Sequence, residues 1–145
     1  MMEKDYSAVP PSSKKPAATT APASTAQVMA RYFKAAGISH IFGLPGGQNI
    51  EFMEAARKEG IEFVLARREG TAALMADAAG QLTGVPGVCM STLGPGSTNL
   101  VNGVANAYLD RSPVIAVSGQ LGTRLEATFT HQNIELRNHR GAEVP

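Results

Sequence analysis

A glutamate stands directly after two arginines and opens an alanine-rich segment. Residues 67–80 read RREGTAALMADAAG, so Glu69 follows Arg67 and Arg68 and precedes a stretch with almost no other charge. This composition predicts a helix that is buried on nearly every side. A carboxylate in its first turn can simply stabilise the helix dipole. It can also keep a proton available in a poorly solvated pocket, where desolvation disfavours the charged form.

The segments around Glu69 predict helices and strands in alternation. A helix begins after Ser24, which has capping-box spacing to Gln27, and Gly37 can close it. Strands of this length separated by such helices give a parallel sheet with helices on both faces, a single three-layer α/β/α domain. The predicted helices are 24–37, 48–60, 69–84 and 97–110, and the predicted strands with their turns are 38–47, 61–66, 87–96 and 113–120. Of these strands, 61–66 reads as a buried one.

Ligands collect at the carboxyl ends of the strands in such a sheet, so the turns after the strands are the candidate sites. These turns read GLPGGQN, ARREG, TLGPGSTN and SGQLGT. Glycine lets backbone amides approach a ligand, and a following helix N-terminus adds partial positive charge. Tight turns need glycine in any case, so one turn taken alone decides nothing.

The GPGSTN turn also partly matches the phosphate fingerprint of dinucleotide-binding domains. Its third glycine position is occupied by Asn99, and the acidic residue expected about 20 residues further on is absent. A Rossmann-like nucleotide-binding domain therefore remains an alternative with a poor motif match.

Composition excludes several classes of partner. The 145 residues carry a net charge of +1 without a basic run, which gives no reason to expect nucleic acid, and no apolar run is long enough for a membrane span. Cys89 is the only cysteine, so a reduced cytoplasmic setting is expected. Residues 1–24 are rich in Pro, Ala, Ser and Lys and predict a disordered leader.

The turns together resemble one family. The segments FGLPGGQN, RREGTAALMADAAGQLTG, STLGPGSTNLVNGVANAYLDRSPVIAVSGQ and FTHQNIE occur in the order of the N-terminal, pyrimidine-binding domain of thiamine-diphosphate enzymes of the acetolactate synthase and pyruvate oxidase group. The resemblance runs over 25–135 and leaves 136–145 as a divergent or truncated tail. It implies a six-stranded parallel α/β domain that binds the cofactor at an interface with a diphosphate-binding domain.

The resemblance also implies roles for individual residues. Glu69 stands where the family has the glutamate that contacts N1′ of the aminopyrimidine and favours the tautomer that accepts the C2 proton. The turn at Gly46 and Gly47 matches the one beside cofactor and substrate. Residues implied to seat the aminopyrimidine are Pro95, Gly96 and Asn99, and those implied to face the substrate or a subunit interface are Gln120 and Gln132.

The family holds the diphosphate and Mg²⁺ with a Gly-Asp-Gly motif followed some way on by an asparagine, and no such segment occurs in this sequence. We therefore expect no metal ligand in this chain, a diphosphate-binding domain or subunit (or a homo-oligomer) as partner, and a small 2-keto acid as substrate. Activity is expected only after complementation. The alternatives are a non-catalytic fragment or interaction module that pairs with a full-length homologue, and the nucleotide-binding domain named above.

Overall fold

The structure, a computed structural model, describes residues 22–122, 132 and 134. The expected leader lies outside these residues except for 22–24, and the expected tail 136–145 lies outside them entirely.

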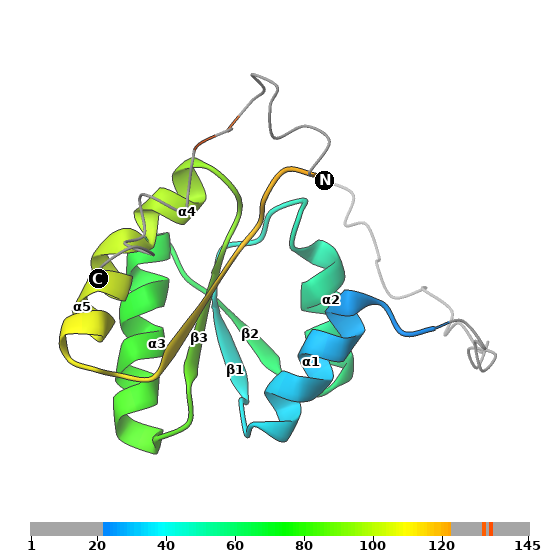
Figure 1. Ribbon diagram of the computed structural model, residues 1–145, viewed down its shortest axis with the longest axis horizontal. Coiled ribbons are helices and arrows are strands. Elements are labelled where there is room, and N and C mark those ends of the chain that lie inside the picture. Colours follow the sequence, from blue (N-terminus) through cyan, green and yellow to red (C-terminus); the bar gives the residue numbers. More distant parts are fainter. Residues whose placement is uncertain (1–21, 123–131, 133, 135–145) are drawn as a thin grey trace, which may run out of the picture.

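Helices and strands alternate as the sequence predicts (Figure 1). The helices are α1 (Thr25–Ala35), α2 (Ile50–Lys58), α3 (Glu69–Thr83), α4 (Pro95–Asn99) and α5 (Val101–Leu109), and the strands are β1 (His40–Gly43), β2 (Glu62–Leu65), β3 (Gly87–Ser91) and β4 (Val114–Ser118). The predicted capping box is confirmed, because Ser24 Oγ accepts from Gln27 N at 3.3 Å and Gln27 Oε1 accepts from Ser24 N at 3.0 Å.

The strands of the described residues form one parallel sheet in the order β2-β1-β3-β4. The resemblance implied six strands, and the described part of the chain contains four of them. From the neighbouring strands β1 and β3, the chain continues outward in opposite directions, to β2 on one side and to β4 on the other. The carboxyl ends of β1 and β3 therefore flank the switch point at which open α/β sheets bind ligands.

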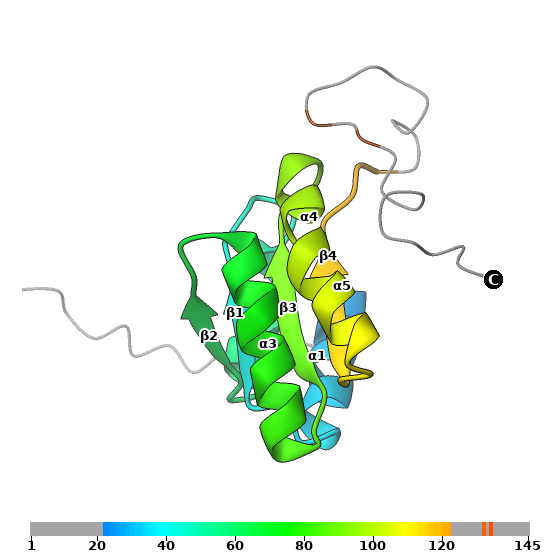
Figure 2. The same cartoon turned by 90° about the vertical axis from the view of Figure 1, so that its left-hand side faces the viewer.

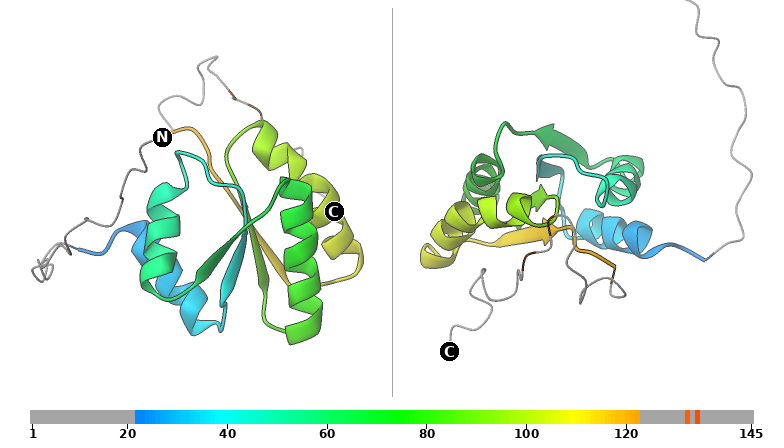
Figure 3. Two further views of the ribbon diagram at one scale, coloured as in Figure 1. Left: turned by 180° about the vertical axis from the view of Figure 1, so that it is seen from behind. Right: turned by 90° about the horizontal axis from the view of Figure 1, so that it is seen from above.

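Two helical layers cover the sheet, α1 and α2 on one face and α3, α4 and α5 on the other (Figure 3). Successive side chains of a strand point to opposite faces. Thus Val88 and Met90 of β3 join the cluster under α1 and α2, whereas Cys89 joins the cluster under α3 and α5. This confirms the predicted three-layer α/β/α arrangement.

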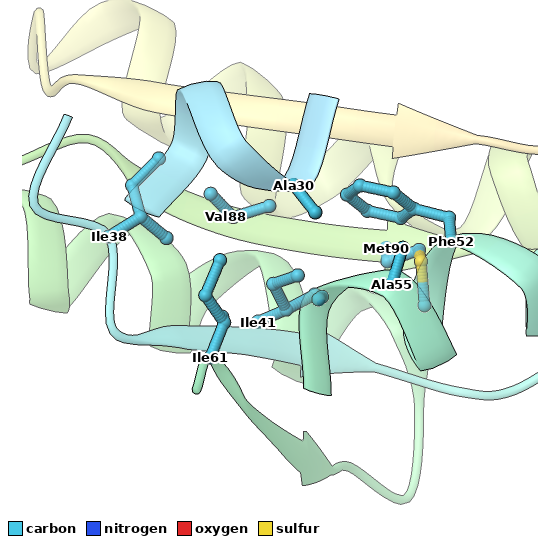
Figure 4. Close-up of a cluster of buried hydrophobic side chains, with 9 residues drawn as sticks. Ala30, Ile38, Ile41, Phe52, Ala55, Ile61, Val88 and Met90 are labelled. Carbon is cyan, nitrogen blue, oxygen red and sulfur yellow. The ribbon is translucent and has the colours of Figure 1, made fainter. Parts of the chain in front are cut away.

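The cluster under α1 and α2 is aliphatic with aromatic contacts (Figure 4). Phe52 of α2 meets Phe33 of α1 edge to face, with ring centroids 5.6 Å apart. This packing fixes the layer of α1 and α2 on the sheet independently of the face that carries Glu69. The buried members are Ala30, Ile38, Ile41, Phe52, Ala55, Ala56, Ile61, Val88 and Met90.

Two predictions about burial are wrong. The β2 strand is at the edge of the described sheet, so its residues are exposed or half-buried, and Leu65 is 69% exposed. The α3 helix buries one face only, through Ala72, Ala73, Ala76, Asp77 and Gly80, while Leu82 on another face is 86% exposed. Alanine predicts the helix correctly but, being small, does not tell which of its sides faces the core.

The helix predicted at 97–110 is two helices. Pro95 opens α4 two residues before the predicted start, at a first-turn position where its missing N–H is not needed. Leu100 separates α4 from α5 and is fully buried, and its N–H donates to Ser97 O at 3.1 Å, the tighter spacing of a 3₁₀ turn.

Candidate cofactor site

The first residue of α3 is Glu69, which lies half-buried at the carboxyl end of the sheet. The preceding arginines, Arg67 and Arg68, are exposed, and Arg68 occupies the N-cap position without a side-chain capping bond. None of the ion pairs among the described residues involves Glu69. The carboxylate is therefore not held by the arginines next to it in the sequence.

Instead, Glu69 is held by a residue 30 positions later. Asn99, the last residue of α4, donates from Nδ2 to Oε2 of Glu69 at 3.1 Å. Within the described residues, the other oxygen, Oε1, accepts no hydrogen bond. The structure thus brings together two of the predicted site residues and leaves one carboxylate oxygen for a further donor.

Gly96 packs closely against that oxygen. A β-carbon at Gly96 would lie 3.3 Å from Oε1 of Glu69 and 2.8 Å from Cγ2 of Thr92, so a larger residue would press on the carboxylate. Gly96 is buried, whereas Pro95 before it is exposed at the start of α4. In the described structure Pro95 opens the helix that carries Asn99.

The turn after β1 reaches this region through Thr92. A β-carbon at Gly46 would lie 2.6 Å from both Cβ and Oγ1 of Thr92, while Gly47 is exposed with nothing within 4 Å. Thr92 Oγ1 donates to Gln48 Oε1 at 2.8 Å. Thr92 therefore lies between Gly46 and Gly96, the glycines of two separate predicted turns.

A second bond fixes the same turn. Asn49 stands at the N-cap of α2, yet its side chain does not cap the helix and instead donates from Nδ2 to Ser91 O at the end of β3. Asn49 is buried, so this bond ties the glycine turn to the central strand.

The two predicted glutamines differ in their surroundings. Gln132 is half-buried and lies against the GPG turn, because a β-carbon at Gly94 would be 2.8 Å from Cβ of Gln132. Gln120 is exposed after β4, and its Oε1 accepts from the N–H of Leu121 at 3.0 Å. The structure therefore brings Gln132 to the turn of Gly96, and it shows the Gln120 side chain bonded only to the neighbouring backbone among the described residues.

Sequence reasoning missed the buried acid of the same helix. Asp77 of α3 is 3% exposed and accepts from Asn106 Nδ2 at 2.7 Å and from Gln81 Nε2 at 2.9 Å. Hydrogen bonding from Ser112, Gln81 and Asn106 lowers the pKa of Asp77. An aspartate among alanines at a core-facing position was the available signal, since buried carboxylates need partners.

Cys89 is a core residue, as expected from its apolar strand. It is fully buried in β3, and this burial raises the pKa of its thiol to about 11. Its thiol is therefore protonated near neutral pH and is unsuited to nucleophilic chemistry.

A groove of about 680 Å³ lies between α3 and the α4–α5 pair. Arg68 and Asn99 line it next to Glu69, and Leu74 and Ala105 line it further along the two helices. In the part of the chain that the structure describes, no set of three or more His, Cys, Asp or Glu residues is grouped as metal ligands. No helix there is long and apolar enough to cross a membrane.

Comparison with known proteins identifies the family. Residues 23–139 match the model of the thiamine pyrophosphate enzyme, N-terminal TPP binding domain. The chain belongs to this family. All residues predicted above for the site lie inside the matched range, including the GPGSTN turn that had suggested a nucleotide-binding alternative.

Three relatives carry acetolactate synthase names. A probable acetolactate synthase large subunit of Methanocaldococcus jannaschii is 43% identical over 110 residues, which cover 76% of this chain and 19% of that protein. The acetolactate synthase of Arthrospira platensis is 44% identical over 104 residues, 69% of this chain and 18% of that protein. The acetolactate synthase isozyme 2 large subunit of Escherichia coli K12 is 38% identical over 111 residues, 77% of this chain and 20% of that protein. The chain thus spans about a fifth of the length of these relatives.

Proposed function

We propose that this chain forms the pyrimidine-binding half of a thiamine-diphosphate site in an acetolactate synthase-like enzyme, with Glu69 as the group that contacts N1′ of the aminopyrimidine. The observation that carries the proposal is the arrangement of the Glu69 carboxylate. Oε2 is held by Asn99 at 3.1 Å, and the described residues leave Oε1, which lies close to Gly96, without a hydrogen-bond donor.

These residues fit the cofactor's aminopyrimidine. A ring nitrogen needs one hydrogen-bonding oxygen, which Oε1 offers, and the lack of a side chain at Gly96 keeps a β-carbon from crowding that oxygen. Asn99 holds the carboxyl group in one orientation, so Glu69 can hold or pass a proton at Oε1 without first reorienting. When bound, the cofactor itself supplies the carbanion chemistry.

The partner and substrate follow from the family and form part of the proposal. We assign the diphosphate and Mg²⁺ to a diphosphate-binding domain in another chain or another part of the protein, and a small 2-keto acid to the shared site. Gly46, Gly47 and Gln132 are proposed to border that site, and exposed Gln120 to face the partner. A reduced cytoplasmic setting is proposed from the lone, buried Cys89.

The test compares two glutamates that both stand in the first turn of a helix. Glu51 occupies the first turn of α2 as Glu69 does that of α3, so Glu51→Gln is matched to Glu69→Gln in charge, size and helix position. The measurement is hydrogen–deuterium exchange at C2 of thiamine diphosphate, in a complex of the chain with a diphosphate-binding domain and Mg²⁺. The free energy of unfolding of each variant is measured in parallel.

We expect both substitutions to change the free energy of unfolding by no more than about 1 kcal/mol, the scale of a helix-terminus charge effect. Only Glu69→Gln should abolish the accelerated exchange, because glutamine keeps the shape but removes the acid. Equal exchange in wild type and Glu69→Gln would reject the catalytic role and favour a non-catalytic interaction module.

A further inference from the structure

The helix that begins at Glu69 and the α4–α5 pair lie side by side on one face of the sheet, with α4 at the end where β3 finishes (Figure 2). Glu69, Ala73 and Asp77 follow each other at four-residue intervals along α3 and therefore share one side of the helix. Asn99, Gly103 and Asn106 are spaced by four and three residues and share a side in the same way.

These two rows of residues face each other at three levels. At the sheet's carboxyl end Asn99 donates to Glu69 at 3.1 Å, and two helical turns away Asn106 donates to Asp77 at 2.7 Å. Between them, a β-carbon at Gly103 would collide with that of Ala73. In both polar contacts an asparagine amide of the α4–α5 pair donates to a carboxylate of α3. The two contacts lie on either side of the close approach between Gly103 and Ala73.

The two polar contacts differ in strength. Asp77 is 3% exposed, also accepts from Gln81, and its backbone carbonyl accepts from Ser112 Oγ at 3.2 Å. Asn99 is exposed and makes one hydrogen bond to a half-buried carboxylate, so water competes for both groups. Asn106 is exposed and also donates from Nδ2 to Asp110 Oδ2 at 3.2 Å, but Asp77 is buried, so the contact between Asn106 and Asp77 is part-buried. This better-protected contact is therefore the one that fixes how far α5 is displaced along α3.

Asn99 and Asn106 belong to almost continuous helix. The only residue between α4 and α5 is Leu100, whose φ of −72° and ψ of −23° are right-handed helical. Seven residues of helix span about 10.5 Å and the eight from Glu69 to Asp77 span about 12 Å, so the two contacts match in spacing. Sliding α5 by one turn, about 5.4 Å, would remove Asn99 from the reach of Glu69.

We infer that Asp77 and Asn106 are positioning residues for Glu69: their part-buried contact sets the register of α5 against α3, and that register keeps Asn99 on Oε2 of the carboxylate. The functional meaning of this inference rests on the function proposed above for Glu69. Its structural content is independent of any cofactor.

The test follows the side-chain amide resonances of Asn99 by NMR in the 145-residue chain. Asn106→Ala removes the donor to Asp77, adds no bulk, and introduces the residue with the highest helix propensity, so it does not weaken α5 by itself. Glu69→Ala provides the reference position of the Asn99 resonances when their acceptor is absent. Phe52→Leu, in the opposite layer, is the control for loss of stability, because Phe52 contacts neither helix row.

In Asn106→Ala the Asn99 resonances should move to their positions in Glu69→Ala, and in Phe52→Leu they should stay at the wild-type positions. Asp77→Asn keeps the shape of the side chain but leaves one acceptor oxygen for two donors, so it should move the resonances in the same direction. Unchanged Asn99 resonances in both Asn106→Ala and Asp77→Asn would overturn the inference. A shift of equal size in Phe52→Leu would also overturn it, since general destabilisation would then explain the effect.

A second measurement connects the register to the proposed chemistry. In the complex with a diphosphate-binding domain, Asn106→Ala should slow C2 exchange by up to about 100-fold, the scale that a misplacement of 1 Å can cost. If Glu69→Gln leaves exchange unchanged, the proposed function fails, while the Asn99 resonances still decide the register. If Glu69→Gln abolishes exchange and the Asn99 resonances do not respond to Asn106→Ala, the register inference fails alone.

Discussion

The close approach of α3 and α5 can be tested with two substitutions, one that adds a methyl group at Gly103 of α5 and one that removes the methyl group of Ala73 in α3. Gly103 is buried, and a β-carbon there would collide with Cβ of Ala73 and lie 3.0 Å from the backbone carbon of Ala73 and the nitrogen of Leu74. Gly103→Ala raises helix propensity by about 1 kcal/mol but overpacks the contact, which costs about 1–3 kcal/mol. We expect a net loss of up to about 2 kcal/mol in the free energy of unfolding.

The complementary change, Ala73→Gly, removes the methyl group that Gly103→Ala would meet. Ala73 is fully buried, so its loss should cost about 1 kcal/mol in helix propensity and about 0.8 kcal/mol in burial of one methyl group. In the double variant the propensity changes cancel and one methyl group again fills the space. Its stability should return to within about 1 kcal/mol of wild type, with a remainder due to the two backbone contacts at 3.0 Å.

The assay is urea unfolding of wild type, the two single variants and the double variant, followed by far-ultraviolet circular dichroism. The four values form a double-mutant cycle with an expected coupling of about 2 kcal/mol. Effects that add to within about 0.5 kcal/mol would show that the two positions do not compete for space, and would refute the packing of the two helices described above.

Three further outcomes are expected. Gly96→Ala should displace the Glu69 carboxylate, because the new methyl group would lie 3.3 Å from Oε1 and 2.8 Å from Thr92 Cγ2; Asn99 side-chain resonances identical to wild type would contradict this. The lowered pKa of Asp77 means that its contribution to stability is complete above the ordinary value of 3.8 and is lost as pH falls through the lower folded value. As the pH is lowered through this range, the thermal midpoint should therefore fall more steeply for wild type than for Asp77→Asn. Parallel curves for the two proteins would contradict a stabilising role of the Asp77 carboxylate. Because burial raises the pKa of Cys89 to about 11, a thiol-reactive dye at roughly pH 8 should label the native chain far more slowly than the urea-unfolded chain, and similar rates would be inconsistent with that burial.

Local sequence signals predicted the order and type of the elements. The capping box at Ser24 and the left-handed Gly37 and Gly84 mark helix boundaries through interactions within a few residues, so they are readable without tertiary information. Edge exposure of β2 and the exposed face of α3 were not predictable in this way. They depend on which strands and helices become neighbours in the fold, and neither an alanine nor a short apolar run indicates those neighbours.

The candidate site shows the same division. Glu69 and Gly96 were predicted from the family resemblance, and the structure brings both together with Asn99. Thr92 and Asp77 were missed, because a threonine at a strand end and an acid within a helix are common in surface positions. Their contacts are with residues 44 and 29 positions away, which only the folded arrangement brings close.

The position of β3 between β1 and β4 has a consequence for how the chain folds. The βαβ unit from β1 to β2 can pair locally, but the turn at Gly46 is fastened by contacts that span 42 and 44 residues, from Asn49 to Ser91 and from Gln48 to Thr92. Contacts of such long sequence separation form late, because loop closure must precede them. The turn at Gly46 should therefore become ordered only when the central strand docks. Substitutions at Thr92 should then accelerate unfolding while leaving the folding rate nearly unchanged, the signature of a contact absent from the transition state.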